Sequence, residues 1–251
     1  MIYGDYHTHT IYSHGKGTIL ENAEIAKQKG ISEIAITDHG FNHILYGVNR
    51  KYLNQMKKEA KEAEDLTGVK VYLGVEANIC SKKGKVDVKK EDLKYLDILV
   101  MGYHKAVRTG AYSFVNFILP NWSRKAKSVK RIKSNTDAFI RAIREYPVDI
   151  ISHINHRANV DVVEVAKVAS EVGCYIELNG RRRHISKEQV QDIVHKTDAM
   201  FVLDSDAHHP DNVGNVEMWH TLAEEYGIPE DRIANLSSPI KLRDKKAFYE
   251  K

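Results

Sequence analysis

The chain has 251 residues, of which 42% are hydrophobic and 29% are charged, with 5 Pro and 15 Gly. This length allows one domain of barrel size or two small domains, and the balance of residue types excludes a disordered chain, a collagen and a coiled coil. The 38 basic and 34 acidic residues leave a net charge of +4, which is too small by itself to indicate a nucleic-acid partner.

Seven short runs rich in β-branched and aromatic residues predict strands, each almost continuously apolar, as in a buried parallel sheet. In chain order the predicted strands are 2–6, 33–37, 70–75, 97–102, 148–152, 174–178 and 199–203. Helical patterns lie between them at 18–29, 49–66, 136–145 and 160–171. A βα unit repeated about seven times predicts an α/β fold, either a closed barrel or an open doubly wound sheet.

No linker rich in Gly, Pro or Ser divides the chain, so we expect one domain over residues 1–251. The segment 103–135 interrupts the βα rhythm with 33 residues that include eight basic residues and no acidic one. A segment this long after a strand is usually functional or mobile. Its aromatic residues, which fit a lid packed on the barrel better than a face for a nucleobase, are Tyr112, Phe114, Phe117 and Trp122.

Neither a membrane span nor an export signal is expected. The longest apolar stretch, 98–102, is far shorter than the ~18 apolar residues of a membrane helix, and the amino terminus lacks a signal-type apolar region. Cys80 and Cys174 are too few for a disulfide framework and do not have the spacing of a metal finger. We therefore expect a cytoplasmic protein with no membrane partner.

Histidines and acidic residues follow the predicted strands. Taken strand by strand, they are Asp5, His7 and His9 with His14, then Asp38 and His39, Glu76, His104, His153, Glu177 with Asn179, and Asp206 with His208. The carboxyl ends of parallel strands face one end of a sheet, so we expect these side chains at one rim. The remaining histidines do not follow a strand, and we expect no ligand role for them: His43, His156, His184, His195, His209 and His220.

This mixture of imidazoles and carboxylates predicts a metal centre. His7 and His9 are two residues apart, so they point to the same side of an extended segment and can reach one ion. Nitrogen and oxygen ligands together favour Zn²⁺, Fe²⁺ or Mn²⁺. The rim holds more ligands than one tetrahedral ion takes, which indicates two or three ions. Clustered divalent ions suit phosphoryl transfer because they polarise the phosphoryl oxygens and generate hydroxide near neutral pH.

Six ordered motifs resemble those of the PHP (polymerase and histidinol phosphatase) domain family, above all its small stand-alone bacterial phosphatases. The motifs are Asp5-Tyr6-His7-Thr8-His9-Thr10, Ile36-Thr37-Asp38-His39-Gly40, Gly74-Val75-Glu76-Ala77-Asn78, Gly102-Tyr103-His104, Ile151-Ser152-His153 and Asp204-Ser205-Asp206-Ala207-His208. The resemblance spans nearly the whole chain. It implies a single-domain, distorted (β/α)7 TIM-like barrel with three metal ions.

The resemblance also implies the ligands of each ion. The first ion would be held by His7, His9, Glu76 and Asp206, the second by Glu76 as a bridge with His104 and His153, and the third by His14, His39 and His208. The catalytic residues would then be Asp206, His208 and Glu76. Asp5 and Asp38 lie beside ligand histidines, and we expect their carboxylates to orient metal-bound imidazoles.

Basic residues near this rim predict contacts with phosphate. The first candidates are Arg108, Arg124, Arg131 and Arg181. For the basic run 123–133, a solvated helix face is the alternative interpretation.

These observations together predict a metal-dependent phosphoesterase that acts on a small phosphate monoester through a hydroxide bridging two ions. Two alternatives remain open. One is a nuclease-like phosphodiesterase acting on nucleotides or single-stranded nucleic acid, which the sequence favours less than a small substrate. The other is a metal-dependent amidohydrolase, which would need a bridging lysine or a single aspartate base, and no lysine follows a predicted strand at that place.

Overall fold

Seven parallel strands form the sheet of the computed structural model, which describes residues 2–108, 124–125 and 127–250. Their order in space equals their order in the chain: β1 (Gly4–Thr8), β2 (Glu33–Ile36), β3 (Lys70–Asn78), β4 (Ile98–Gly102), β5 (Ile150–Ile151), β6 (Tyr175–Asn179) and β7 (Phe201–Asp204). All seven predicted strands are therefore confirmed, with ends that differ by a few residues.

The first and last strands meet, so the sheet is a nearly closed barrel. Thr8 and Ala207 form a parallel bridge, and the His9 amide donates to the Ala207 carbonyl over 2.8 Å. The Tyr6 amide donates to Asp204 Oδ1 over 2.7 Å. Of the two folds that the βα repeat allows, the structure thus has the barrel.

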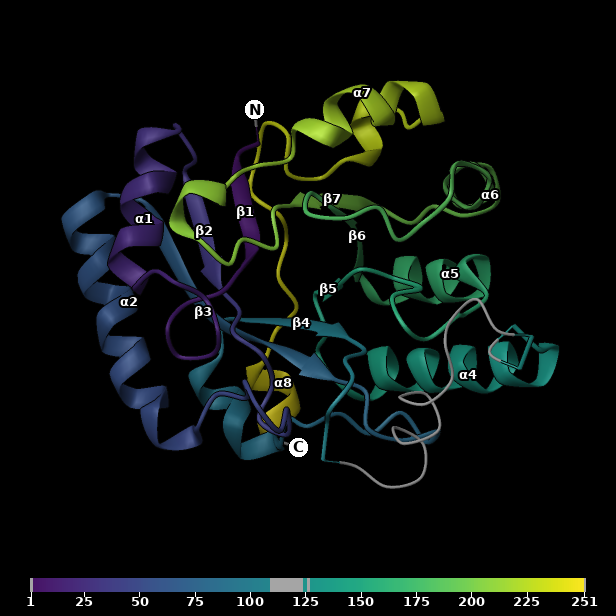
Figure 1. Ribbon diagram of the computed structural model, residues 1–251, viewed down its shortest axis with the longest axis horizontal. Helices are drawn as coiled ribbons and strands as arrows, with labels where there is room; N and C mark the ends of the chain where they lie inside the picture. Colours follow the sequence, from purple (N-terminus) through teal and green to yellow (C-terminus); the bar gives the residue numbers. More distant parts are fainter. Residues whose placement is uncertain (1, 109–123, 126, 251) are drawn as a thin grey trace.

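Helices cover the outside of the barrel. They are α1 (Ile19–Gln28), α2 (Leu53–Thr67), α4 (Val129–Glu145), α5 (Val162–Val172), α6 (Lys187–Lys196), α7 (Glu217–Tyr226) and the short α8 (Lys246–Tyr249), with short 3₁₀ turns η1 (Arg50–Tyr52), η2 (Lys90–Tyr95), η3 (Pro210–Asn212) and η4 (Glu230–Arg232). In Figure 1, α1 and α2 lie on one side of the sheet, and α4 to α7 follow one another along the other side. Between β3 and β4 only η2 occurs, so this connection lacks an α-helix.

Local sequence signals set the helix ends. Thr18 and Glu21 form a capping box at the start of α1, and Asp161 accepts two backbone N–H bonds at the start of α5. Gly68 and Gly173 end α2 and α5 in the left-handed conformation, at φ of 76° and 73°. These caps explain why the ends of these helices could be predicted from the sequence.

Two apolar layers surround the strands. The larger one packs the outward side chains of the strands against the helices. The smaller one fills the barrel interior and consists of Tyr6, Ala35, Ile98, Val100, Ile150, Val202 and Ile240. Side chains alternate between the two layers along each strand, for example Ile98 inside and Leu99 outside.

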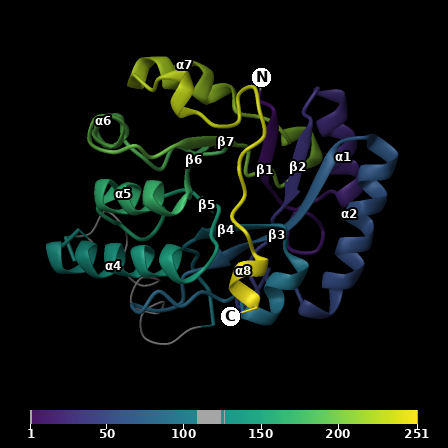
Figure 2. The ribbon, with the colours of Figure 1, turned by 180° about the vertical axis from the view of Figure 1, so that it is seen from behind.

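The C-terminal segment closes the amino-terminal end of the barrel. It runs from α7 to α8 across the face of the molecule that Figure 2 shows. Its Ile240 amide donates to the Tyr6 hydroxyl over 3.3 Å, and its Arg243 amide donates to Asp149 Oδ1 over 2.7 Å. Lys245 Nζ lies 2.5 Å from Asp149 Oδ2. The carboxyl ends of the strands are thereby left as the open end of the barrel.

Helix α4 differs from its prediction. It begins at Val129, seven residues before the expected start at 136, so Arg131 belongs to its first turn. The part of the basic run from Val129 onward is therefore helical, as its alternative interpretation had it. The aromatic residues predicted to form a lid, at 112, 114, 117 and 122, lie outside the described residues. Among the described helices, none is long and apolar enough to cross a membrane.

Candidate metal centre

The carboxyl ends of the strands bring the predicted ligand residues into one buried cluster. Glu76, at the carboxyl end of β3, lies at its middle and is fully buried. Its Oε2 atom lies 3.0 Å from His39 Nδ1, 3.3 Å from His104 Nε2 and 3.4 Å from His7 Nε2. Its Oε1 atom lies 2.6 Å from His153 Nε2. One carboxylate thus faces imidazoles from four different strand ends.

Asp206 is the second carboxylate of the cluster. Its Oδ1 atom lies 3.3 Å from both His9 Nε2 and His208 Nδ1. The Nε2 atoms of His7 and His9 are 3.2 Å apart, so these two rings face the same place, as their spacing predicts. The two acidic residues therefore share a continuous set of imidazoles.

Among the described residues, three groups of side chains have ligand atoms close enough to hold one ion each. In each group the ligand atoms lie within 4.8 Å of one another: His7, His9 and Glu76, then His39, Glu76 and His104, then His9, His39 and His208. His14, the third member of the expected third group, is replaced there by His9. The His14 ring still lies beside both other rings of the expected group. Its centroid is 4.8 Å from that of His39, with planes at 10°, and 4.2 Å from that of His208, and the Tyr46 ring stacks on it at 4.4 Å.

Unpaired buried atoms test whether metal ions fit this cluster. Glu76 Oε2 and one ring nitrogen each of His9, His14, His39 and His153 are buried and have no hydrogen-bond partner among the described residues. Burying such atoms without a partner costs about 1–3 kcal/mol each. Divalent ions bound by the carboxylate would remove this cost for Glu76 Oε2. The donor set therefore fits transition-metal ions.

Burial and neighbouring charges shift the pKa values of the cluster in both directions. Burial lowers the pKa values of His7 and His153, but the carboxylates around them, Glu76 first, outweigh it and raise both. Burial raises the pKa of Glu76, but the imidazoles of His104, His7 and His153 overcome it and hold that pKa well below its usual range. Burial and the neighbouring His39 and His208 lower the pKa of His14 to about 3, and burial is the main cause that lowers the pKa of His208 to about 4. At neutral pH these two rings are uncharged, which is the form that binds metal ions.

Buried polar side chains fix the orientation of the ligand imidazoles. Glu177 Oε1 lies 2.5 Å from His7 Nδ1, and its Oε2 accepts the backbone N–H of His153 over 2.5 Å. Asn78 Oδ1 lies 2.8 Å from His104 Nδ1. Asn179 Nδ2 donates to Glu177 Oε2 over 3.0 Å and to Asp206 Oδ2 over 3.2 Å. Glu177 and Asn179 follow a predicted strand, and that position was the only sequence signal for this role.

Asp5 and Asp38 do not have the role expected from the sequence. Neither carboxylate bonds to an imidazole among the described residues. Asp5 accepts hydrogen bonds from the hydroxyl and amide of Ser205 and from the Gly214 amide, and Asp38 accepts bonds from Thr10 and Ser13. Both are fully buried. They therefore hold the backbone of the loops that carry the ligands.

The backbone is strained at two of the predicted ligands. His153 has φ of 28° and Asp206 has φ of 52°, which non-glycine residues rarely adopt. Each is the second residue after the end of a short buried strand, β5 or β7. Strain of this kind persists where the surrounding structure imposes it, and it is common at functional sites.

A cavity of about 230 Å³, which we call the ligand cavity, opens onto the cluster. It is lined by His14, His39, His43, Tyr46, His104, His153, His156, Arg181, Arg182, His184, Asp206 and His208. His43, His156 and His184, for which we expected no ligand role, thus line the cavity, although none of them belongs to the three ligand groups found among the described residues. They come from loops whose path no strand pattern predicts. His195 and His220 are exposed on α6 and α7, as expected.

Only one of the four predicted phosphate-binding arginines reaches the centre. Arg181 lines the ligand cavity, and its Nη1 atom lies 3.1 Å from His208 Nδ1. Arg108, Arg124 and Arg131 do not line it. Arg182, which belongs to the same basic run as Arg181 after the predicted strand 174–178, also lines the cavity. Position after a strand therefore predicted a cavity-lining arginine better than membership of the basic run 123–133 did.

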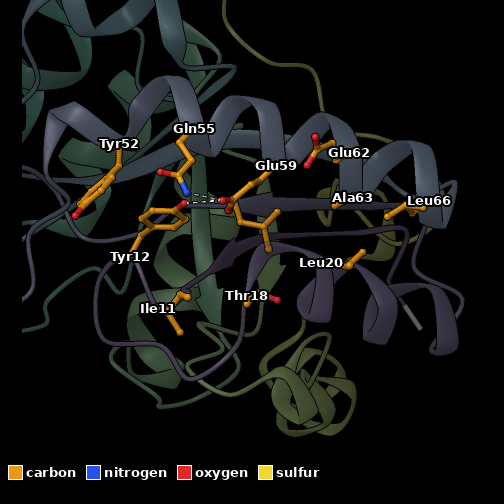
Figure 3. A pocket seen from close by; sticks show the side chains of 11 residues that line it. Ile11, Tyr12, Thr18, Leu20, Tyr52, Gln55, Glu59, Glu62, Ala63 and Leu66 are labelled. Atoms are coloured by element: carbon orange, nitrogen blue, oxygen red, sulfur yellow. Dashed lines mark hydrogen bonds between the residues drawn. The ribbon is translucent and has the colours of Figure 1, made fainter.

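A separate groove of about 600 Å³ lies between α1 and α2 (Figure 3). There the Tyr12 hydroxyl and the Gln55 amide both donate to Glu59 Oε1 over 2.9 Å. None of the side chains lining this groove is a histidine. The bonds at Glu59 anchor the loop that continues to His14, but the groove has no metal-binding chemistry.

Comparisons with known proteins identify a family and a fold for this chain. The PHP domain family matches residues 5–202. A protein of Caldanaerobacter subterraneus subsp. tengcongensis named "probable phosphatase" is 34% identical over 247 residues, which cover 93% of this chain and 87% of the relative. A "probable phosphatase" of Proteus mirabilis is 31% identical over 254 residues, covering 96% and 92%. The crystal structure of histidinol phosphate phosphatase from Lactococcus lactis, complexed with zinc, L-histidinol and phosphate, has the same fold, with a TM-score of 0.64 at 14% identity over 94% of this chain and 97% of that one.

Proposed function

The chain belongs to the PHP family, a metal-dependent phosphoesterase family, and we propose that it hydrolyses a small phosphate monoester with three divalent ions bound at the strand ends. The observation that carries this proposal is the position of Glu76, a fully buried carboxylate that faces four imidazoles and has an unpaired oxygen. The phosphatase names of the relatives support the reaction class. The zinc and phosphate of the Lactococcus lactis structure support the kind of ion and ligand.

Each ion has its own set of ligands in this proposal. Glu76 would be a ligand of two ions, one held together with His7, His9 and Asp206 and one held together with His104 and His153. His39 and His208 hold the third, with His9 close enough to contribute and His14 stacked beside it. When bound, such ions would make water a nucleophile near neutral pH and would polarise the oxygens of a phosphoryl group.

The residues of the chain bind and orient the substrate. Arg181 and Arg182 line the ligand cavity, where their guanidinium groups can bind phosphoryl oxygens that do not face the ions. Asp206 and His208 are held beside Arg181, with Asp206 Oδ1 3.9 Å from Arg181 Nη1. The buried bonds of Glu177 and Asn179 keep His7 and Asp206 in place, so little reorganisation is needed when substrate binds.

Chelation and restoration test the proposal. Removing metal with a chelator should abolish hydrolysis of p-nitrophenyl phosphate, and Zn²⁺ or Mn²⁺ should restore it. Asp206→Asn and His153→Ala should each lower kcat by several orders of magnitude, because each loosens the ions. His195→Ala, a change of an exposed histidine outside the cavity, is the matched control and should keep full activity.

Two results would overturn the proposal. Full activity of Asp206→Asn, or hydrolysis that a chelator does not inhibit, would show that the reaction does not depend on the metal centre. A faster reaction with bis-p-nitrophenyl phosphate than with the monoester would show a phosphodiesterase. A faster reaction with an anilide would show an amidohydrolase.

A further inference from the structure

A second cavity, which we call the side cavity, opens beside the ligand cavity and shares part of its wall. It measures about 430 Å³, and His14, Arg181, Asp206 and His208 line both cavities. The rest of its lining consists of Lys16, Gly180, Ser205, His209, Asn212 and Asn215. His209, for which we expected no ligand role, lines the side cavity but not the ligand cavity. Since the wall is shared, a molecule with its phosphoryl group in the ligand cavity can extend into the side cavity.

The lining of the side cavity is polar. No phenylalanine, tyrosine, tryptophan or aliphatic side chain belongs to it, so it does not fit a nucleobase or an acyl chain. The side chains of Lys16, Asn212 and Asn215 are exposed and bond to no other described residue. Their donors are therefore available to a bound molecule.

The charge of the side cavity is positive. Lys16 and Arg181 are its cations, and Asp206 is the only carboxylate among the lining residues. Asp206 Oδ1 faces His9 and His208, both at 3.3 Å, and so belongs to the metal cluster. Arg181 has Asp206 as a partner, with Nη1 and Oδ1 3.9 Å apart, whereas the Lys16 ammonium group has no ion pair with a described residue. The favoured ligand of the surface around Lys16, Asn212 and Asn215 is therefore an anion.

Backbone contacts make the shape of the side cavity rigid. The Lys16 amide donates to the His208 carbonyl over 2.9 Å, which joins two of its walls. A Cβ atom on Gly180 would lie 2.2 Å from the Asn215 carbonyl oxygen, so only glycine allows these two segments to approach so closely. The cavity is therefore preformed around its donors, which lowers the cost of ordering them on binding.

Hydrogen bonds from residues outside the side cavity also hold the turn that contains Asn212 and Asn215. Lys29 Nζ donates to the carbonyls of Asp211 and Val213, both over 2.7 Å. The Gly214 amide donates to the buried Asp5 over 2.7 Å. Asp5 is thus part of the support of this wall.

We propose that the side cavity binds a second anionic group of the substrate, a carboxylate or a phosphate. Lys16 and Arg181 provide the positive charge, and Asn212 and Asn215 provide amide donors. This inference rests on the proposed function, because the phosphoryl group to be hydrolysed occupies the ligand cavity. It assigns the substrate to small, polar phosphomonoesters that carry a second acidic group.

A series of esters that differ only at one end tests the proposal on the metal-loaded protein. The probes are propyl phosphate, aminopropyl phosphate, carboxyethyl phosphate and propanediol bisphosphate. We expect kcat/KM to be at least about tenfold higher for the two acid-ended esters than for propyl phosphate, the effect of one charge-assisted hydrogen bond. The better of the two acid-ended esters identifies the second group as carboxylate or phosphate.

A lysine variant assigns the effect to the side cavity. Lys16→Gln should reduce the preference for acid-ended over neutral esters about tenfold. Lys57→Gln removes the same charge from an exposed position on α2, outside both cavities, and should leave the preference unchanged. Raising the salt concentration should weaken the preference in the parent protein.

Calorimetric titration provides a second measurement that does not depend on turnover. The non-hydrolysable phosphonate analogue carboxypropyl phosphonate should bind with a Kd at least about tenfold lower than butyl phosphonate, and Lys16→Gln should remove most of this difference. Equal Kd values, a preference for aminopropyl phosphate, or an unchanged preference in Lys16→Gln would each overturn the inference. These results differ from failure of the proposed function, in which none of the four esters is hydrolysed in a metal-dependent way.

Discussion

Replacing Glu177 with glutamine should weaken metal binding although Glu177 is not itself one of the proposed metal ligands. The Glu177 carboxylate is fully buried and accepts three hydrogen bonds, from His7 Nδ1 and the His153 amide at 2.5 Å and from Asn179 Nδ2 at 3.0 Å. A carboxylate only accepts, so it fixes the proton of His7 on Nδ1 and leaves Nε2 as the lone pair that faces Glu76. Glutamine has one oxygen and one NH₂ group.

Neither orientation of the glutamine amide satisfies all three partners. If its NH₂ group faces His7, the ring proton moves to Nε2 and blocks the ligand nitrogen. If the NH₂ group faces the His153 amide and Asn179, donors oppose donors. Loss of one hydrogen bond to a charged acceptor costs about 1.5–3 kcal/mol, and loss of such an orienting partner lowers metal affinity about 10–100-fold, which is about 1.4–2.8 kcal/mol.

Competition with a chromogenic zinc chelator measures this loss. Glu33→Gln is the matched control, because Glu33 is also buried but accepts only from the hydroxyls of Tyr6 and Tyr72, which can donate or accept. It should keep the metal affinity of the parent. Thermal unfolding of the metal-free proteins checks that both variants fold. A Glu177→Gln affinity within about twofold of the parent would show that the Glu177–His7 contact does not control the metal centre.

Three further predictions follow from other parts of the structure. Metal analysis should find about three ions per chain in the parent and a loss of more than one in Glu76→Ala, and one ion or fewer in the parent would contradict the clustered centre. Lys245→Met should lower the free energy of unfolding in urea by about 3–5 kcal/mol, because it leaves the fully buried Asp149 without its cation, and a change near zero would refute this role. Burial and the nearby Glu33 raise the pKa of Tyr72 to about 12. The folded state then holds this proton more tightly than the unfolded state, so stability should fall as pH rises from about 10 to 12, and Tyr72→Phe should make that fall less steep in urea titrations.

The sequence by itself determined the strands and the residues that follow them. A short, nearly continuous apolar run between turn signals defines a buried strand locally, so the positions of β1 to β7 could be predicted. The carboxyl ends of parallel strands lie at one end of a barrel, so the predicted ligands, Glu76 and His153 among them, could be placed at a single rim from the sequence. The same rule applies to Arg181, which follows β6.

Tertiary structure alone decided which loop residues join the centre and which partner each acidic side chain takes. His43, His156 and His184 reach the ligand cavity through the folding of loops, and no local pattern encodes such a path. Asp38 stands next to His39 in the chain, yet it bonds to Thr10 and Ser13 because adjacent side chains at a strand end point in different directions. His9 groups with His39 and His208, whereas His14 stacks beside them, because the exact path of one loop sets which nitrogen faces the centre. Sequence spacing limits which residues can meet, and packing selects among them.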